Sequence, residues 1–174
     1  MKVIGIAGFS GSGKTTLIER LVPVLVEGGL RVSLIKHAHH EFDVDQPGKD
    51  SYRHRHAGCT EVLVSSGRRW ALMHELRGAP EPSLEEQLRR FAPCDLVIVE
   101  GYKNEPIPKI EVHRREWDAP LLYKTNAHVV AVATDEPLDT TLPQLPLDEA
   151  AAVARFMIEH LGLARHPQAK QAAC

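Results

Sequence analysis

One glycine-rich stretch constrains the fold of this chain more than any other feature. Residues 8–15 read GFSGSGKT and match the pattern G-x-x-x-x-G-K-[ST] at every required position. An apolar run over residues 3–7 precedes this loop, and apolar residues at helical spacing follow it over residues 15–26. The order predicts a strand, a glycine loop and a helix, with backbone N–H groups and the helix start turned toward an anion.

Short apolar runs alternate with helical segments along the rest of the chain, which favours a parallel sheet flanked by helices. Pro23 is expected to kink the first helix or to end it early, before Gly28. The predicted fold class is α/β, with a P-loop NTPase-type, mostly parallel sheet flanked by helices and a β-hairpin extension. The remaining predicted elements are strands at 32–36, 96–99, 109–113 and 129–133, a hairpin of strands 61–65 and 69–74, a short basic helix at 50–58, a helix after a capping box at 83–86, and a last helix capped by Asp148.

The length of 174 residues, with 43% hydrophobic and 25% charged residues, is typical of one globular domain. We expect a single nucleotide-binding domain over residues 1–163, including the hairpin at 61–74, and a flexible tail at 164–174. The net charge of -2 gives no basic field for nucleic acid, and no apolar stretch reaches the length that crosses a bilayer. Three separate cysteines without a CxxC pair favour reduced thiols and a cytoplasmic protein.

The glycine loop predicts a nucleoside triphosphate with Mg²⁺ as its ligand. Lys14 is expected to reach the outer phosphates, the Thr15 hydroxyl to bind Mg²⁺, and Thr16 to hydrogen-bond an inner phosphate. The motif specifies neither the base nor the reaction. The predicted phosphate-binding residues are Ser10, Gly11, Ser12, Gly13, Lys14, Thr15 and Thr16.

A carboxylate is expected beside the metal, because Mg²⁺ prefers oxygen ligands. Glu100 directly follows a buried run at 96–99, so it lies at the strand end that faces the ligand crevice in such sheets. It is the candidate to bind the metal or to orient an attacking water, and Lys14 and Glu100 are the candidate catalytic residues. Asp43, Asp45 and Asp50 are rival metal ligands, since their loop also follows a predicted strand.

Residues 36–56 form a polar segment that holds five of the ten histidines. One interpretation is a transition-metal site made of imidazoles and carboxylates, although the spacing matches no standard zinc pattern. A second is an anion or partner site, and a third is a solvated loop. The cations that would meet an anion are Lys36, Lys49, Arg53 and Arg55.

Three blocks of the sequence resemble the MobB family, the molybdopterin-guanine dinucleotide biosynthesis adapter proteins. They are residues 8–17, residues 36–51 with 57–58, and residues 99–103 with 108–112. The first block is shared by many P-loop proteins, whereas the other two are much more specific to this family. Together with the element order, the blocks cover most of residues 1–160.

The resemblance implies a dimeric GTP-binding protein with weak GTPase activity. Such a protein supports the molybdenum cofactor guanylyltransferase, the enzyme that joins GMP to molybdopterin, and direct contact with the pterin stays open. By the same resemblance, Glu100 lies near the metal, and the residues that bind GTP phosphates are Gly11, Gly13, Lys14, Thr15 and Thr16.

Guanine selection has no standard motif here, because N-K-x-D is absent. Asp135, which follows the predicted strand at 129–133, is placed either to read the guanine edge or to start the turn before Pro137. No glutamine or arginine finger is evident, so slow hydrolysis is expected. Arg53, Arg55, Lys103 or a residue of a second subunit would supply the missing charge. The hairpin is the candidate dimer surface.

Two other functional classes remain at this point. A P-loop small-molecule kinase would need a catalytic base such as Asp43 or Asp45. A GTP-driven metal chaperone would use His37, His39 and His40. Phosphate transfer to an acceptor would indicate the first class, and stoichiometric nickel or zinc binding would indicate the second.

Overall fold

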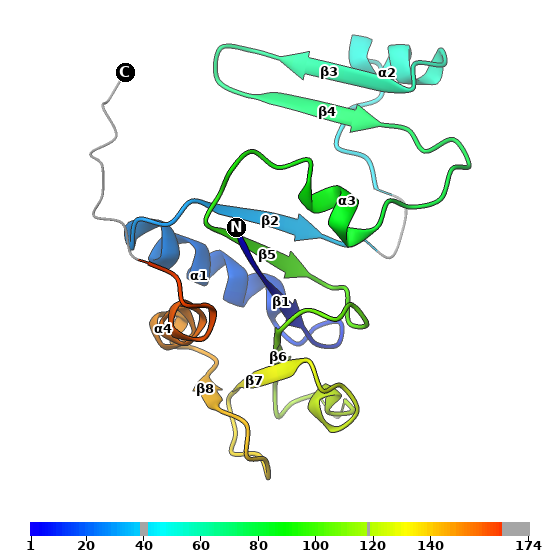
Figure 1. Ribbon diagram of the computed structural model, residues 1–174. Coiled ribbons are helices and arrows are strands. Elements are labelled where there is room, and N and C mark those ends of the chain that lie inside the picture. The colour runs from blue at the N-terminus through cyan, green and yellow to red at the C-terminus, as the bar shows by residue number, and fades with distance from the viewer. Residues whose placement is uncertain (39–41, 118, 165–174) are drawn as a thin grey trace. The chain divides into compact units, whose positions relative to one another are not determined.

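The computed structural model describes residues 1–38, 42–117 and 119–164. Its backbone forms two compact units, which are described separately here (Figure 1). The first unit comprises residues 1–37 and the chain from residue 91 onward, and the second comprises residues 38–90. The predicted single domain over 1–163 stays a prediction. Of the predicted tail at 164–174, residues 165–174 lie outside the described residues.

A six-stranded sheet forms the centre of the first unit, in the order β2-β5-β1-β6-β7-β8. Every strand pair recorded in this sheet is parallel. This topology confirms the predicted fold class, and it places β1 between β5 and β6. The strands are β1 (Lys2–Ala7), β2 (Val32–Lys36), β5 (Leu96–Glu100), β6 (Lys109–His113), β7 (Val129–Thr134) and β8 (Gln144–Pro146).

Helices α1 (Lys14–Glu27) and α4 (Ala150–Leu161) pack against each other and against one face of the sheet (Figure 1). The early end expected at Pro23 does not occur, because α1 continues to Glu27. The buried side chains of this helix lie on both sides of the proline, so packing of the apolar face outweighs the lost backbone hydrogen bond. Those buried side chains are Leu17, Ile18, Leu21 and Leu25.

Two details near the end of the first unit differ from the sequence prediction. Glu149, not Asp148, is the residue before α4, and it makes no side-chain capping hydrogen bond. Asp148 instead forms an exposed ion pair with Arg20 at 3.5 Å. The short strand β8 lies within residues 138–146, which contain two prolines, and the sequence pattern did not reveal it. Pro146 is tolerated there because β8 is the edge of the sheet and needs fewer backbone donors.

The second unit contains the predicted hairpin of β3 (Glu61–Ser65) and β4 (Trp70–His74), whose strands pair antiparallel. Helix α2 (Asp50–His56) precedes the hairpin and α3 (Leu84–Leu88) follows it. The predicted capping box is present, since Ser83 and Glu86 exchange side-chain to backbone hydrogen bonds. The sequence pattern was therefore sufficient to identify these local elements.

Cys59 and Cys94 are free thiols. Within the described residues, none of the helices combines the length and the apolar character that crossing a bilayer requires.

Candidate phosphate-binding site

The loop after β1 adopts a backbone that only glycine accepts at three points. The φ angles of Gly8, Gly11 and Gly13 are 152°, 82° and 92°. A Cβ added at Gly8 would lie 2.6 Å from the carbonyl oxygen of Val112, so a side chain is also excluded by space. Gly13 precedes α1 and no side chain caps this helix start. The first N–H groups of α1 therefore lack a side-chain acceptor, which is the arrangement that binds phosphate.

Lys14 folds back over the loop. Its ammonium group donates hydrogen bonds to the carbonyl oxygens of Gly8 at 3.0 Å and Phe9 at 2.7 Å. Partial burial lowers the pKa of Lys14, and the nearby charges of Lys103 and Lys36 lower this pKa further, whereas Glu100 opposes the shift. The ammonium ion thus lies in surroundings that favour its charge less than water does, and an anion beside it would reverse that effect.

The hydroxyl of Thr15 donates a hydrogen bond of 2.8 Å to the carboxylate of Glu100. Glu100 is only 6% exposed. Because β2 and β5 pair with Lys36 opposite Glu100, the Lys36 ammonium group lies 3.6 Å from the same carboxylate. A hydroxyl and a carboxylate are the hard oxygen donors that suit Mg²⁺, so the residues present fit this metal. Two of the three residues predicted to bind metal are therefore in contact.

The other predicted residues of the loop differ in their surroundings. Ser12 is 3% exposed, and its hydroxyl has no hydrogen-bond partner among the described residues. A buried hydroxyl without a partner is unfavourable, so this group is suited to meet a ligand atom. Ser10 and Thr16 are exposed. Ser10 and Ser12 lie in the loop, and Thr16 lies in the first turn of α1.

Glu100 is held by a strained turn. Gly101 and Tyr102 both have positive φ angles, 98° and 45°, and the latter is uncommon for a bulky residue. The backbone N–H of His37 donates to the carbonyl oxygen of Glu100 at 3.0 Å, and the rings of His37 and Tyr102 lie 4.7 Å apart. Two family-specific blocks that are far apart in the sequence therefore meet at this carboxylate.

Charged residues of the block at 108–112 have roles inside the sheet. Lys109 is fully buried and donates to the carbonyl oxygen of Glu105 at 2.6 Å, and its burial lowers the pKa of Lys109. The carboxylate of Glu111 accepts the backbone N–H groups of Leu122 and Tyr123, at 2.7 and 2.9 Å. This contact holds the start of a short 3-10 helix at Leu122–Lys124. Both side chains stabilise the fold.

The structure brings two residues to the loop that sequence reasoning missed. The guanidinium of Arg114 lies 3.0 Å, at its Nε, from the point where a Cβ of Gly13 would be. The ring of Trp117 lies 2.6 Å from the corresponding point at Gly11. Both follow β6, which pairs with β1, so the segment after β6 meets the loop after β1. Arg114 and Trp117 could have been identified from the strand order, but they belong to no sequence motif.

Asp135 lies beside the same segment. Its carboxylate accepts the backbone N–H of Arg115 at 2.9 Å and lies 3.7 Å from a guanidinium nitrogen of Arg114. The side chain thus orders the segment after β6. The predicted contact of Asp135 with guanine stays a prediction.

Several candidate residues of the second unit take part in one charge cluster. The guanidinium of Arg55 contacts Asp43 at 2.7 Å, Asp45 at 3.4 Å and also the carboxylate of Glu75. The hydrogen bond from Arg55 is the main cause that lowers the pKa of Asp43. A carboxylate with a lowered pKa is a weaker base, which disfavours Asp43 as the base of a kinase. Arg55 is also surrounded by acceptors, so it does not serve as a free arginine finger.

The remaining metal candidates of the polar segment are Asp50 and three histidines, of which the structure describes only His37. Asp50 is exposed in the second unit, and its carboxylate lies 3.7 Å from Arg53. Its predicted role as a metal ligand stays a prediction. His39 and His40 lie outside the described residues, and within the described part of the chain no three His, Cys, Asp or Glu side chains gather as metal ligands.

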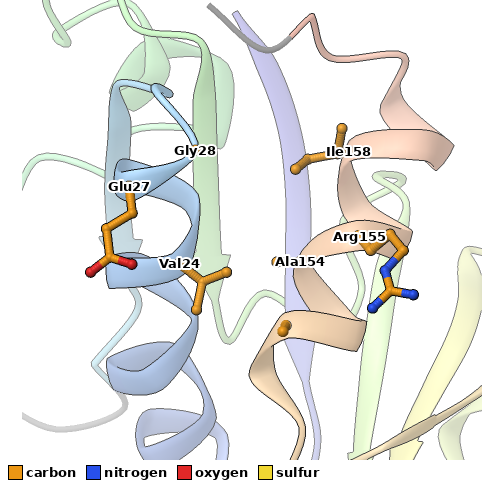
Figure 2. Close-up of a pocket in the computed structure, with 7 residues that line it drawn as sticks. Val24, Glu27, Gly28, Ala154, Arg155 and Ile158 are labelled. Carbon is orange, nitrogen blue, oxygen red and sulfur yellow. The ribbon is translucent and has the colours of Figure 1, made fainter. Parts of the chain in front are cut away.

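A groove of about 340 Å³ lies between the last turns of α1 and the helix α4 (Figure 2). Its apolar lining includes Val24 and Ile158, and Glu27 and Arg155 stand at its sides. Val24 is ten positions beyond Lys14, so the groove lies roughly 15 Å along α1 from the phosphate loop. None of the predicted site residues lines it. The candidate site is therefore the loop and its surrounding residues, not this groove.

The parallel sheet, the glycine loop between β1 and α1, and the carboxylate at the end of β5 place the chain in the class of P-loop nucleotide-binding folds. Residues 3–135 match the family described as molybdopterin guanine dinucleotide synthesis protein B, MobB. The chain belongs to this family.

Relatives with the same family name are similar over nearly the whole chain. The molybdopterin-guanine dinucleotide biosynthesis adapter protein of Haemophilus influenzae is 45% identical over 158 residues, which are 89% of this chain and 86% of the relative. The adapter protein of Escherichia coli is 41% identical over 160 residues, 90% of this chain and 91% of the relative. The crystal structure of a MobB homologue from Bacillus stearothermophilus has a TM-score of 0.71 at 29% identity and covers 93% of this chain and 99% of its own.

Proposed function

We propose that the chain is a GTP-binding adapter with weak GTPase activity in the synthesis of molybdopterin guanine dinucleotide. The adapter role follows from the family and from relatives that carry this name at 41% and 45% identity. The partner is the guanylyltransferase that joins GMP to molybdopterin.

One observation carries the nucleotide part of the proposal. The loop combines three positive-φ glycines, a helix start without a side-chain cap and an ammonium group folded over the loop backbone. Converging N–H groups and one cation are the features that recognise the phosphates of a nucleotide. The residues assigned to the phosphates are Ser10, Gly11, Ser12, Gly13, Lys14, Thr15 and Thr16.

The hydroxyl of Thr15 and the carboxylate of Glu100 are the proposed ligands of Mg²⁺, directly or through water. When bound, this metal neutralises charge on the phosphates. Lys14 stabilises the charge that grows on the phosphate as water attacks and GDP leaves. Glu100 orients the metal or the attacking water. Hydrolysis is expected to be slow because no glutamine is assigned to position this water, and the chain serves mainly as an adapter.

The homodimer is proposed to form through the hairpin of the second unit. Leu63 and Leu72 pair directly across its strands, and Trp70 lies on the same face two residues from Leu72. All three are exposed, at 59%, 44% and 67% respectively. An exposed apolar strand pair invites association with another chain. A Leu63→Glu variant is expected to be monomeric by light scattering, with the monomer fold retained. A dimer that persists in this variant would contradict the assignment.

The experiment that tests nucleotide binding is titration calorimetry of the full chain with GTP and Mg²⁺. We expect one GTP per chain, and binding below detection in Lys14→Ala with an unchanged circular dichroism spectrum. Equal GTP affinity in the two proteins would reject the phosphate site. Titration with ATP tests the base preference, and with it the sequence-based prediction that Asp135 reads guanine.

The adapter role is tested by a pull-down of the purified guanylyltransferase on the immobilised chain. We expect retention of the enzyme in the presence of GTP and less retention with Lys14→Ala. A transferase that is not retained with or without GTP would reject the proposed partner and leave the nucleotide assignment standing.

A further inference from the structure

The segment that follows β6 lies over the phosphate loop. The Nε, Nη2 and Cζ atoms of Arg114 lie 3.0, 3.4 and 3.7 Å from the point where a Cβ of Gly13 would be. The edge of the guanidinium that carries Nε and Nη2 therefore faces Gly13. Gly13 is the residue that directly precedes the uncapped start of α1. A cation thus lies beside the residue that precedes α1, near the helix N–H groups that would meet an anion.

Within the described residues, the charge of Arg114 is weakly neutralised. The ion pair recorded for its guanidinium in the described chain is with Asp135 at 3.7 Å, and the Arg114 side chain is 29% exposed. The planar fork of an arginine matches two phosphate oxygens, so this geometry suits a phosphate chain. Burial is the main cause that lowers the pKa of Lys14 beside the same loop, and the charges of Lys103 and Lys36 lower this pKa further.

We propose that Arg114 binds the phosphates of the nucleotide from within the same chain, and that Asp135 positions it. This inference rests on the proposed nucleotide function. Asp135 holds the segment by accepting the Arg115 N–H at 2.9 Å and directs the guanidinium of Arg114 by its charge. In this role the carboxylate does not read guanine, so it differs from the role predicted from the sequence.

The ring of Trp117 provides an independent reporter of the site. Its ring atoms lie 2.6 to 3.1 Å from the point where a Cβ of Gly11 would be, and the backbone N–H of Trp117 donates to the carbonyl oxygen of Arg114 at 3.0 Å. A ligand that contacts Arg114 would therefore alter the surroundings of this ring. The chain has two tryptophans, and the other, Trp70, is in the hairpin.

The test compares neighbouring arginines by titration with GTP and Mg²⁺. Arg114→Ala is expected to weaken GTP binding roughly tenfold to a hundredfold, the range for loss of a charged hydrogen bond. Arg114→Lys should retain part of the affinity, because it keeps the charge without the planar fork. Arg115→Ala is the matched control, since its side chain is 81% exposed and lies 3.8 Å from Glu136. Its affinity should equal that of the wild type.

Tryptophan emission keeps the inference testable if Arg114→Ala folds poorly. GTP should change the emission of the wild type and of Trp70→Phe, and this change should vanish in Trp117→Phe. Equal GTP affinity in Arg114→Lys, Arg114→Ala and the wild type would overturn the inference. Equal losses in the Arg114→Ala and Arg115→Ala variants would overturn it too, because they would indicate a general charge effect.

The positioning role of Asp135 has its own readout. Asp135→Asn keeps an oxygen acceptor for the Arg115 N–H but removes the charge that faces Arg114. We expect a loss of GTP affinity of several-fold that is absent in an Arg114→Ala background, as two residues acting through one contact require. The ratio of GTP to ATP affinity should not change. A changed ratio would indicate that Asp135 contacts the guanine base and would overturn the proposed positioning role of Asp135.

The Lys14→Ala titration separates the two levels of the proposal. If the wild type itself binds no GTP, the proposed function fails together with the inference. If Lys14→Ala loses binding while Arg114→Ala matches the wild type, the phosphate site stands and only the assignment of Arg114 fails.

Discussion

Arg55 and Arg114 show how one residue type serves two different purposes in this molecule. The Arg55 side chain is 9% exposed and contacts three carboxylates of its own unit. The Arg114 side chain is 29% exposed, and its recorded carboxylate partner in the described chain is 3.7 Å away. The protein therefore neutralises the first guanidinium by itself, whereas the second is only partly neutralised. A guanidinium whose N–H groups are surrounded by carboxylates stabilises the fold, whereas one with weakly paired N–H groups is suited to bind a ligand.

The surroundings extend this contrast. Around the phosphate loop, the ammonium of Lys103 lies 3.9 Å from the centre of the Phe9 ring, and Lys14 and Lys36 share the carboxylate of Glu100 as a nearby charge. Positive charge thus exceeds negative charge there, and an anion would balance it. Around Arg55 the carboxylates outnumber the cation, so binding of a phosphate at that point is disfavoured.

The largest effect is expected from removing the cation that the protein itself neutralises. Arg55→Ala would leave Asp43, Asp45 and Glu75 close together without their shared partner, so we expect the melting temperature to fall by several degrees. Hydrogen exchange should rise within residues 38–90. Arg53→Ala is the matched control, since this side chain is 73% exposed and pairs at 3.7 Å within its own helix. Equal melting temperatures for Arg55→Ala and the wild type would show that Arg55 does not stabilise the second unit.

The contrast also explains what the sequence could predict. The phosphate loop is local, because eight consecutive residues between a strand and a helix determine its backbone, and the structure agrees with the pattern there. The position of Glu100 beside this loop was predictable because Glu100 ends a buried strand, and its role at a metal stays a prediction. The position of Arg114 beside the loop was not predicted, since it depends on β6 lying beside β1. Strand order is a long-range property that apolar spacing does not specify.

The same limit applies to the charged residues of the second unit. A sequence pattern marks Arg55 and Asp43 as polar and places both in one segment, but it does not pair them with Glu75 from beyond the hairpin. The sequence therefore predicted Arg55 as a free cation and Asp43 as a possible base. In the structure the two side chains form an ion pair with each other.

The next largest effect concerns the hydroxyl beside Glu100. Thr15→Val removes the group that donates to the carboxylate at 2.8 Å, while the shape of the side chain is kept. We expect a roughly tenfold loss of GTP affinity in the presence of Mg²⁺ and little change when Mg²⁺ is chelated. Thr15→Ser restores the hydroxyl and should restore the affinity. An equal loss with and without Mg²⁺ would show that the hydroxyl contributes by another route.

A smaller change in binding, with a larger change in turnover, is expected at Glu100. Glu100→Gln keeps the size and the acceptor oxygen but removes the charge that faces Thr15 and Lys36. We expect phosphate release from GTP to slow about tenfold, with a loss of GTP affinity of only a few-fold. Single-turnover assays and calorimetry measure the two quantities separately. A normal hydrolysis rate would exclude Glu100 from the mechanism.

The smallest effect is a pH dependence that belongs to the neutralised cluster. The hydrogen bond from Arg55 lowers the pKa of Asp43 below its ordinary value of 3.8. A carboxylate whose pKa is lowered by folding stabilises the protein above its unfolded pKa, and this contribution is lost as the pH falls through the folded pKa. The melting temperature of the wild type should therefore exceed that of Asp43→Asn at about pH 6, and the difference should shrink below about pH 4.

Asp50→Asn is the control for this titration, because Asp50 is 87% exposed and its partner Arg53 is 3.7 Å away. An exposed pair of this kind contributes little, so the difference between Asp50→Asn and the wild type should stay near zero over the same pH range. A difference for Asp43→Asn that is constant with pH would mean that the carboxylate acts by its shape and hydrogen bonds alone. The charge of Arg55 would then be balanced by Asp45 and Glu75 alone. Arg55 would still differ from Arg114, but with two neutralising carboxylates and not three.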